Sequence, residues 1–349
     1  MGDILGLGVT HYPALTPRTI RPISLPRTLA DPGLPERLRV PAGWPAAMRD
    51  EWGEDEGAAA AERHRAALVR ELRRARDILD EFAPDFVVVW GDDQYENFTE
   101  DVMPAFCVLA YERLACHPWR RAGGAPNYWG EPDDMLLQVP GHQAGAKLLT
   151  AGLLHAGFDV AYAYRPLHVE LGHAFINTVL YLDWDRRGFP YPLVPFAVNC
   201  FGRRVIRFRG YMGGLGEAVG EDELDPPSPS PRRCFELGAA CARTLAASPW
   251  RVALVASSSW SHSFLTPKHY CLYPDLAADR ELFAALVAGD YAVWRERTLS
   301  QVEDSGQQEL LNWFCLVGAM AELGLRTRDA VLIESHVMNS NKVIASFRA

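Results

Sequence analysis

Apolar positions along the chain follow two different spacings, and each spacing predicts a different element. Continuous apolar runs at residues 3–9, 85–90 and 251–256 are typical of strands that are buried on both faces of a sheet. Over 58–82 the apolar positions instead recur every three or four residues, with charged residues between them. This pattern predicts a helix with one buried face, and Pro84 follows as a stop signal.

The remaining segments extend the alternation of strand and helix. We predict helices over 143–156, 234–247, 279–300 and 306–323, strands over 158–164, 191–198, 331–334 and 342–347, and an interrupted segment over 168–182. Residues 12–57 are rich in proline and lack a period, which predicts a lid or wall of an active site. The whole pattern predicts an α/β fold: one large domain over residues 1–349 with a central, mostly parallel sheet flanked by helices.

One further segment interrupts the alternation. Residues from about 205 to 232 are rich in Gly, Pro, Ser and acidic residues. We expect a loop-rich, exposed insertion there, placed so that it shields the functional site.

Composition narrows the class of partner. The 349 residues are 48% hydrophobic and carry a net charge of -9, so the chain can bury a large core but has no basic footprint for nucleic acid. No apolar stretch is long enough to span a membrane, and the N-terminus has no signal-peptide pattern. The seven scattered cysteines form no Cys-x-x-Cys pair, which predicts free thiols in the cytoplasm. A small molecule is the expected partner.

Polar, ligand-rich residues follow three of the predicted strands. His11 follows the first, Asp92, Asp93 and Gln94 follow the second, and His262 follows a serine-rich turn after the third. Because ligands collect at the carboxyl ends of parallel strands, we expect these residues to share one cleft. Each has a plainer interpretation: a loop histidine bonded to backbone for His11 or His262, and a helix cap or anchor of a ligand for the two aspartates.

Two more residues are candidates on weaker local grounds. His173 lies in a Gly-His pair and is either a buried structural histidine or part of the site. Glu309 begins a helical run and faces either solvent or the site. Phosphate-binding loops, dinucleotide-binding glycine motifs and the strained serine elbow of hydrolases are absent from the sequence.

Taken in order, these motifs resemble those of one family. The order is a first strand ending in His11, then Val-Val-Val-Trp-Gly-Asp-Asp-Gln at 87–94, Leu-Gly-His at 171–173, Ser-His-Ser at 261–263 and Gln-Glu-Leu-Leu-Asn-Trp at 308–313. The chain resembles the class III extradiol ring-cleavage dioxygenases, which include the catalytic β-subunit of protocatechuate 4,5-dioxygenase. The resemblance implies a non-haem Fe(II) cofactor held by two histidines and a glutamate.

Residue by residue, the resemblance assigns roles to four positions. His11 matches the first histidine ligand, and Glu309 matches the carboxylate ligand. His262 matches the catalytic acid/base, and His173 matches a second catalytic histidine near the substrate.

The fifth position departs from the family pattern. Gln94 stands where the resemblance expects the second histidine ligand. Three interpretations stay open: Gln94 binds the metal through its side-chain oxygen, Asp92 or Asp93 takes over as the ligand, or the protein holds little iron.

The implied activity is O2-dependent opening of a catechol-type ring, protocatechuate- or gallate-like, next to its two hydroxyls. The implied setting is aromatic catabolism by a cytoplasmic enzyme that is a homo-oligomer, expected to be a dimer. Two alternatives remain: a homologue whose altered metal site acts on another aromatic compound, and a metal-poor binding protein.

Overall fold

One eight-stranded sheet organises the chain. The computed structural model describes residues 2–20, 22, 24–119, 127, 129–217 and 219–348. Across the sheet the strands are β6 (Ala161–Ala163), β3 (Phe106–Leu109), β7 (Leu193–Val198), β2 (Phe86–Asp92), β8 (Val252–Ser257), β1 (Ile4–Val9), β10 (Lys342–Phe347) and β9 (Thr327–Ile333).

The centre of the sheet is parallel. Strands β7, β2, β8 and β1 are neighbours that all run in one direction, and β3 pairs in parallel with β6. Antiparallel pairing is confined to the β3–β7 contact and to the edge formed by β10 and β9. The predicted fold class, a mostly parallel central sheet flanked by helices, is confirmed.

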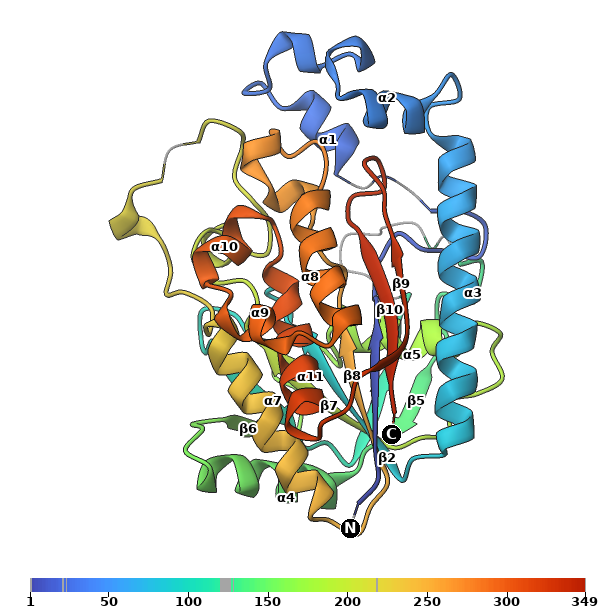
Figure 1. Ribbon diagram of the computed structural model, residues 1–349, viewed down its shortest axis with the longest axis vertical. Helices are drawn as coiled ribbons and strands as arrows, with labels where there is room; N and C mark the ends of the chain where they lie inside the picture. Colours follow the sequence, from blue (N-terminus) through green and yellow to red (C-terminus); the bar gives the residue numbers. More distant parts are fainter. Residues whose placement is uncertain are drawn as a thin grey trace.

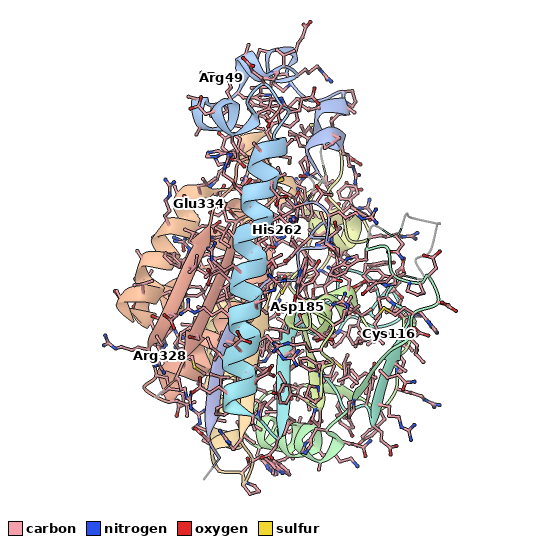
Figure 2. All side chains as sticks on the ribbon, turned by 90° about the vertical axis from the view of Figure 1, so that its right-hand side faces the viewer. Arg49, Cys116, Asp185, His262, Arg328 and Glu334 are labelled. Carbon is pink, nitrogen blue, oxygen red and sulfur yellow. The ribbon has the colours of Figure 1, made fainter. Side chains whose placement is uncertain are left out.

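Helices cover both faces of this sheet (Figure 1). On one face lie α3 (Ala58–Phe82), which runs along the outside of the sheet in Figure 2, and α5 (His173–Leu182). On the other face lie α4 (Gln143–His155), α7 (Pro231–Ala246) and α11 (Leu311–Glu322).

The alternation of side chains in β2 explains its continuous apolar run. Val87 and Val89 pack into the core beneath α3, while Val88 and Trp90 pack into the core on the opposite side. A strand buried on both faces has no position at which a polar side chain would be solvated, so every residue of the run is apolar.

The structure corrects three of the predicted segments. Residues 12–57 contain short helices, α1 (Leu25–Ala30) and α2 (Ala46–Trp52), which lie beyond the end of the sheet opposite the chain termini (Figure 1). The helix predicted over 279–300 is divided into α8 (Leu276–Ala288), α9 (Tyr291–Glu296) and the start of α10 (Leu299–Asp304). Gly289, with φ of +69°, ends α8, because a left-handed residue cannot continue a helix. The interrupted segment over 168–182 contains α5.

Three short strands escaped prediction because they carry little periodic signal. They are β3 in the main sheet and the pair β4 (Arg113–Cys116) and β5 (Leu137–Pro140), which forms a separate two-stranded sheet. The four residues of β3 are all buried between β7 and β6, so its pairing depends on distant parts of the chain.

The predicted insertion is largely irregular. It begins within α6 (Arg204–Arg207) and includes one short 3-10 turn, Glu221–Glu223, before α7; Ala218 lies outside the described residues. All seven cysteines are free, as predicted, and the structure shows that they are also buried. Among the described helices, none combines the length and the apolar character that crossing a membrane requires.

Candidate active site

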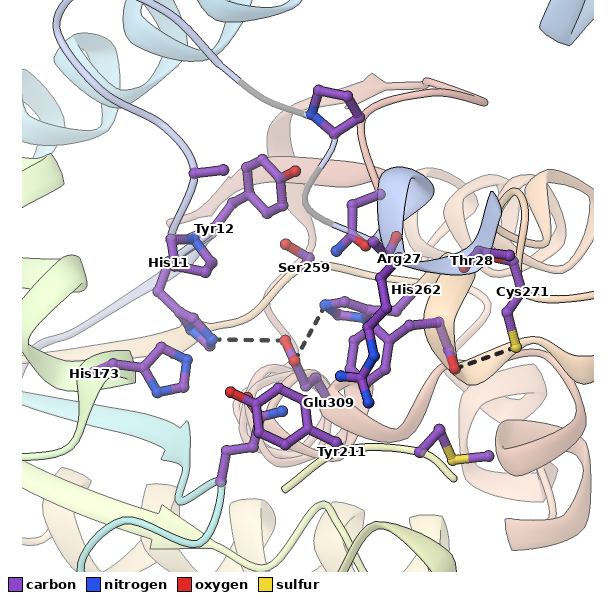
Figure 3. Close-up of a pocket in the computed structure, with 18 of the residues that line it drawn as sticks. His11, Tyr12, Arg27, Thr28, His173, Tyr211, Ser259, His262, Cys271 and Glu309 are labelled. Atoms are coloured by element: carbon purple, nitrogen blue, oxygen red, sulfur yellow. Dashed lines mark hydrogen bonds and ion pairs between the residues drawn. The ribbon is translucent and has the colours of Figure 1, made fainter. Parts of the chain in front are cut away.

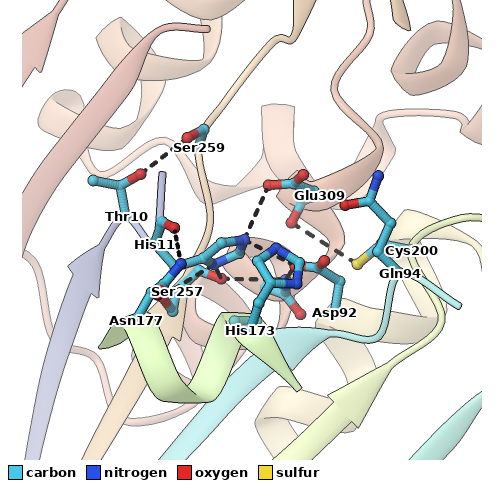
Figure 4. Close-up of polar contacts among 12 residues, drawn as sticks. Thr10, His11, Asp92, Gln94, His173, Asn177, Cys200, Ser257, Ser259 and Glu309 are labelled. Carbon is cyan, nitrogen blue, oxygen red and sulfur yellow. Dashed lines mark hydrogen bonds and ion pairs between the residues drawn. The ribbon is translucent and has the colours of Figure 1, made fainter. Parts of the chain in front are cut away.

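The carboxyl ends of β1, β8 and β2 meet at one edge of the sheet, as the sequence predicted. Val9 of β1 pairs with Ser257 of β8, so His11 lies just beyond this edge. Asp92 is the last residue of β2, and His262 follows β8 by five residues. Because neighbouring parallel strands end on the same side, residues far apart in the chain are delivered to one place (Figure 4).

His11 is a buried imidazole with a defined tautomer. Its Nδ1 lies 2.9 Å from the carbonyl oxygen of Ser257, and since a carbonyl only accepts, Nδ1 carries the proton. The other nitrogen, Nε2, therefore offers a lone pair, and it faces Asp92 and Glu309 at 3.4 and 3.6 Å. Burial lowers the pKa of His11 to about 4, so the ring is neutral at physiological pH, as metal binding requires.

His173 has the same arrangement on the opposite side. It begins α5, and its Nδ1 lies 2.8 Å from Oε2 of Glu96. Its ring meets the ring of His11 edge to face, with 5.0 Å between the centroids. Burial works against the charged ring, but Glu96 and the other nearby carboxylates outweigh it and raise the pKa of His173 to about 10. The ring orientation of His173 is thus fixed by Glu96, and in its charged form Nε2 is a hydrogen-bond donor.

The two adjacent aspartates have different surroundings. The carboxylate of Asp93 accepts the backbone N–H groups of Glu96, Asn97 and Phe98, so it caps the turn after β2. Asp92 instead faces His11, is fully buried, and its Oδ2 has no hydrogen-bond partner among the described residues. Burial, together with nearby Glu309, raises the pKa of Asp92 well above its usual range. A buried carboxylate of this kind is satisfied by a cation.

Gln94, the predicted third ligand, lines the same cavity as His11 and Glu309, but its side-chain amide already makes one hydrogen bond. Its side-chain nitrogen donates a hydrogen bond to the carbonyl oxygen of Gly210 in the insertion. This bond leaves the side-chain oxygen as the only donor atom that Gln94 can offer to a metal.

Glu309 lies between two histidines. It belongs to a 3-10 turn, Gln308–Leu310, and its Oε1 lies 3.1 Å from Nε2 of His262. Its other oxygen, Oε2, faces His11. Burial opposes ionisation, but the charge of His262 and the other histidines outweighs burial and lowers the pKa of Glu309.

A buried aspartate that the sequence did not single out supports this arrangement. Asp279 of α8 accepts hydrogen bonds from the backbone N–H and hydroxyl of Ser261, from Gln307 and from Asn341. Ser261 is adjacent to His262, and Gln307 is two residues before Glu309. Asp279 therefore ties together the two segments that carry these site residues. On sequence grounds it looks like an ordinary acidic residue of a helix.

The donor atoms fit a divalent metal ion. Among the His, Cys, Asp and Glu side chains of the described residues, one compact group of possible ligands occurs: atoms of His11, Asp92 and His173 all lie within 4.8 Å of one another. Two imidazoles and one carboxylate are the donor set typical of non-haem iron. The structure thus brings His11, His173, His262 and Glu309 together, and it places Asp92, one of the open alternatives for the third ligand, 3.4 Å from Nε2 of His11.

A cavity of about 520 Å³ opens beside these residues (Figure 3). Its inner end includes His11, His173, His262 and Glu309. Aromatic residues form much of the wall: Tyr12, Trp119, Trp129, Tyr211 and Phe264. Trp119 and Trp129 stack with 5.3 Å between ring centroids. The size and the lining suit a substituted aromatic molecule.

Comparison with known proteins finds relatives by sequence. Three of them are named 2,3-dihydroxyphenylpropionate/2,3-dihydroxicinnamic acid 1,2-dioxygenase. The relative from Photorhabdus laumondii is 24% identical over 79% of this chain and 76% of its own length. Those from Burkholderia vietnamiensis and Paraburkholderia phymatum are 29% and 30% identical over 58% and 64% of this chain. The latter two alignments cover 51% and 56% of the relatives.

The other comparisons add less. No protein-family model matches the chain. The solved structure of an uncharacterized protein from Escherichia coli K12 aligns with 80% of this chain and 91% of its own, at 14% identity and a TM-score of 0.46. The sequence relatives, by their names, are ring dioxygenases.

Proposed function

We propose that this chain is a class III extradiol dioxygenase, which uses O2 to open a catechol-type ring next to its two hydroxyls. One observation carries the proposal: His11 and His173 converge with Glu309 at the inner end of an aromatic-walled cavity, and Asp92 lies against the two histidines. The names of the sequence relatives support the same reaction class.

The proposed metal site keeps His11 and Glu309 as ligands. Asp92 is our first choice for the position that Gln94 occupies in the motif, because its carboxylate faces His11 and its Oδ2 has no hydrogen-bond partner among the described residues. Fe(II) held there would lower the pKa of a catechol hydroxyl and leave open positions for the diol and O2.

The remaining residues would bind the substrate and move its protons. His262 lines the cavity, and its Nε2 is oriented by Glu309, so we assign it the transfer of the substrate's hydroxyl proton. His173 is held by Glu96 beside the same space and would donate a hydrogen bond to the substrate. The tryptophan pair and Tyr12 exclude water from the ring.

Gln94 supports a second candidate. A side-chain amide is a weaker metal ligand than imidazole, so a homologue that acts on another aromatic compound, or a metal-poor binding protein, is the alternative. The retention of His11, His173, His262 and Glu309 in one cavity favours the enzyme, because a binding protein has no need of this proton-transfer machinery.

The proposal includes three further expectations from the sequence. They are one catalytic domain over residues 1–349, a cytoplasmic location consistent with seven free thiols, and a homodimer. Cell fractionation and light scattering of the purified chain test the last two.

The decisive experiment is to purify the protein anaerobically, measure bound iron, and follow O2 uptake with a panel of catechols. The panel holds protocatechuate, gallate and 2,3-dihydroxyphenylpropionate. We expect bound iron and a yellow ring-opened product from at least one compound. If the protein takes up no Fe(II) and consumes no O2 with any catechol, the dioxygenase assignment is wrong.

A further inference from the structure

The cavity has a second, chemically different end. Its inner end is formed by buried histidines and Glu309, whereas Arg27, an exposed residue of α1, lines the outer part. Figure 3 shows Arg27 extending from α1 into the cavity, toward Tyr211. A volume of about 520 Å³ exceeds what a bare diol ring needs, so a substituent on the ring would reach this outer part.

The guanidinium of Arg27 is a candidate anion-binding group. In the part of the chain that the structure describes, no carboxylate lies within 4.0 Å of this guanidinium. Asp31, one turn further along the chain, also lines the cavity, but its two oxygens accept the backbone N–H groups of Gly33 and Leu215. Asp31, the acidic residue nearest to Arg27 in the sequence, therefore binds the insertion to the end of α1 and is not paired with Arg27.

One face of Arg27 is already positioned. Its guanidinium carbon lies 5.2 Å from the centre of the Tyr211 ring, a cation–π arrangement that restrains the side chain. The N–H groups at the edge of the guanidinium remain available to a ligand. A planar fork of N–H donors matches the two oxygens of a carboxylate, and charge-assisted pairs of this kind are stronger than neutral hydrogen bonds.

We propose that Arg27 is a specificity-determining residue that binds a carboxylate on the substrate's side chain, while the diol occupies the end formed by His11 and Glu309. The inference rests on the proposed function and adds the residue that would recognise the acidic substituent. A carboxylate is favoured over a phosphate, because a single arginine beside the acidic Asp31 suits one negative charge better than two.

The consequence is orientation as well as affinity. Arg27 would hold a charged substituent at the outer end, so the diol is directed toward His11 and Glu309. A neutral substituent gains no such contact and should bind in either direction.

The test compares two catechols that differ only in charge: 2,3-dihydroxyphenylpropionate and its primary amide. For the native protein we expect kcat/KM to be at least about tenfold higher for the acid than for the amide, since hydrogen bonds to charged groups are worth about that factor or more. Arg27→Met should lose roughly ten- to hundredfold on the acid and less than about threefold on the amide. Arg27→Lys should recover part of the loss.

A matched control is Arg37→Met. Arg37 is another exposed arginine of the same N-terminal segment, and it does not line the cavity. It should leave the acid-to-amide ratio unchanged. Equal losses on both compounds in Arg27→Met, or no loss on either, would overturn the assignment.

Failure of the proposed function is separable from failure of this inference. If no catechol is oxidised, calorimetric titration with 3-phenylpropionate, which has no diol, still measures carboxylate binding. Weaker binding to Arg27→Met than to Arg37→Met supports the inference, and equal binding contradicts it. Tighter binding of phenylphosphonate than of 3-phenylpropionate would contradict the choice of carboxylate.

Discussion

The carboxylate oxygen Oδ1 of Asp92 lies 3.4 Å from Nε2 of His11, and the surrounding chain seals both side chains from solvent. Their proximity results from the sheet. Asp92 ends β2 and His11 follows β1, and both strands pair in parallel with β8, so their carboxyl ends lie at the same edge. The imidazole of His11 is neutral, and Oδ2 of Asp92 has no hydrogen-bond partner among the described residues. For this reason we propose Asp92, in place of Gln94, as the third ligand.

Replacing Asp92 by Asn should show whether Asp92 or Gln94 is the third metal ligand. The substitution keeps the shape and removes the ionisable oxygen, so we expect Fe(II) affinity to fall roughly ten- to hundredfold, as loss of a supporting metal contact does. The metal-free variant should be no less stable than the native chain, because burial disfavours the charged carboxylate and raises the pKa of Asp92 well above its usual range. Anaerobic Fe(II) titration and thermal unfolding measure the two quantities. Gln94→Ala is the comparison, and a larger loss of affinity there would return the ligand role to Gln94.

Glu309 and His262 should differ in what their removal abolishes. Glu309→Ala should abolish retention of the metal while leaving the fold intact, as judged by circular dichroism. His262→Gln should keep the metal and lower kcat by roughly 10²- to 10⁴-fold, the usual contribution of a proton-transferring side chain. Iron analysis and O2 uptake on the same preparations check both. Unchanged iron in Glu309→Ala would remove Glu309 from the site.

The buried carboxyl of Asp279 should make stability depend on pH. Burial raises its pKa from the ordinary 3.8 to about 6, although Ser261, Gln307 and Asn341 donate to it. Between these two values the folded chain binds more protons than the unfolded chain, so the free energy of unfolding falls as pH rises. The loss amounts to at most about 3 kcal/mol and levels off above pH 6, at about 1.4 kcal/mol per pKa unit.

Asp279→Asn isolates this effect from other titrating groups. Urea unfolding of both proteins at pH 4, 5, 6 and 7 should show the native chain losing stability relative to the variant as pH rises. A difference that does not change with pH would show that Asp279 has no raised pKa. The variant should also be less stable at every pH, because its amide N–H faces hydrogen-bond donors.

Gly8 should be intolerant of any side chain. It lies in β1, and a Cβ at this position would be 1.9 Å from the ring atom Cη2 of Trp313 on α11. Gly8→Ala should therefore lower the free energy of unfolding by about 1–3 kcal/mol or more, the usual cost of overpacking a core. Gly214→Ala is the control: its Cβ would meet only an oxygen of Asp31 at 3.5 Å. A denaturation midpoint of Gly8→Ala equal to that of Gly214→Ala would contradict the expected clash.

The local sequence was enough to predict those helices and strands whose apolar positions follow a clear period or form a continuous run. The helix predicted over 58–82 has the observed bounds, and the apolar runs before His11 and Asp92 are strands. The rule that parallel strands deliver ligands to one edge was enough to predict that His11, His262 and the acidic pair would converge. The positions of turns were harder to predict. Apolar spacing predicted a single helix over 279–300, but Gly289 ends α8 within that range.

The tertiary structure alone decided which of these residues face one another. Asp92 and Asp93 are adjacent acids, and only the path of the turn after β2 makes one a cap and the other a partner of His11. Asp279 and Arg27 carry no local signal, because the residues that they contact are distant in the chain: Asn341 is 62 residues from Asp279, and Tyr211 lies in the insertion, far from Arg27. Periodicity reports which face of an element is buried, whereas a site depends on the distances between elements, and packing of the whole chain sets those distances.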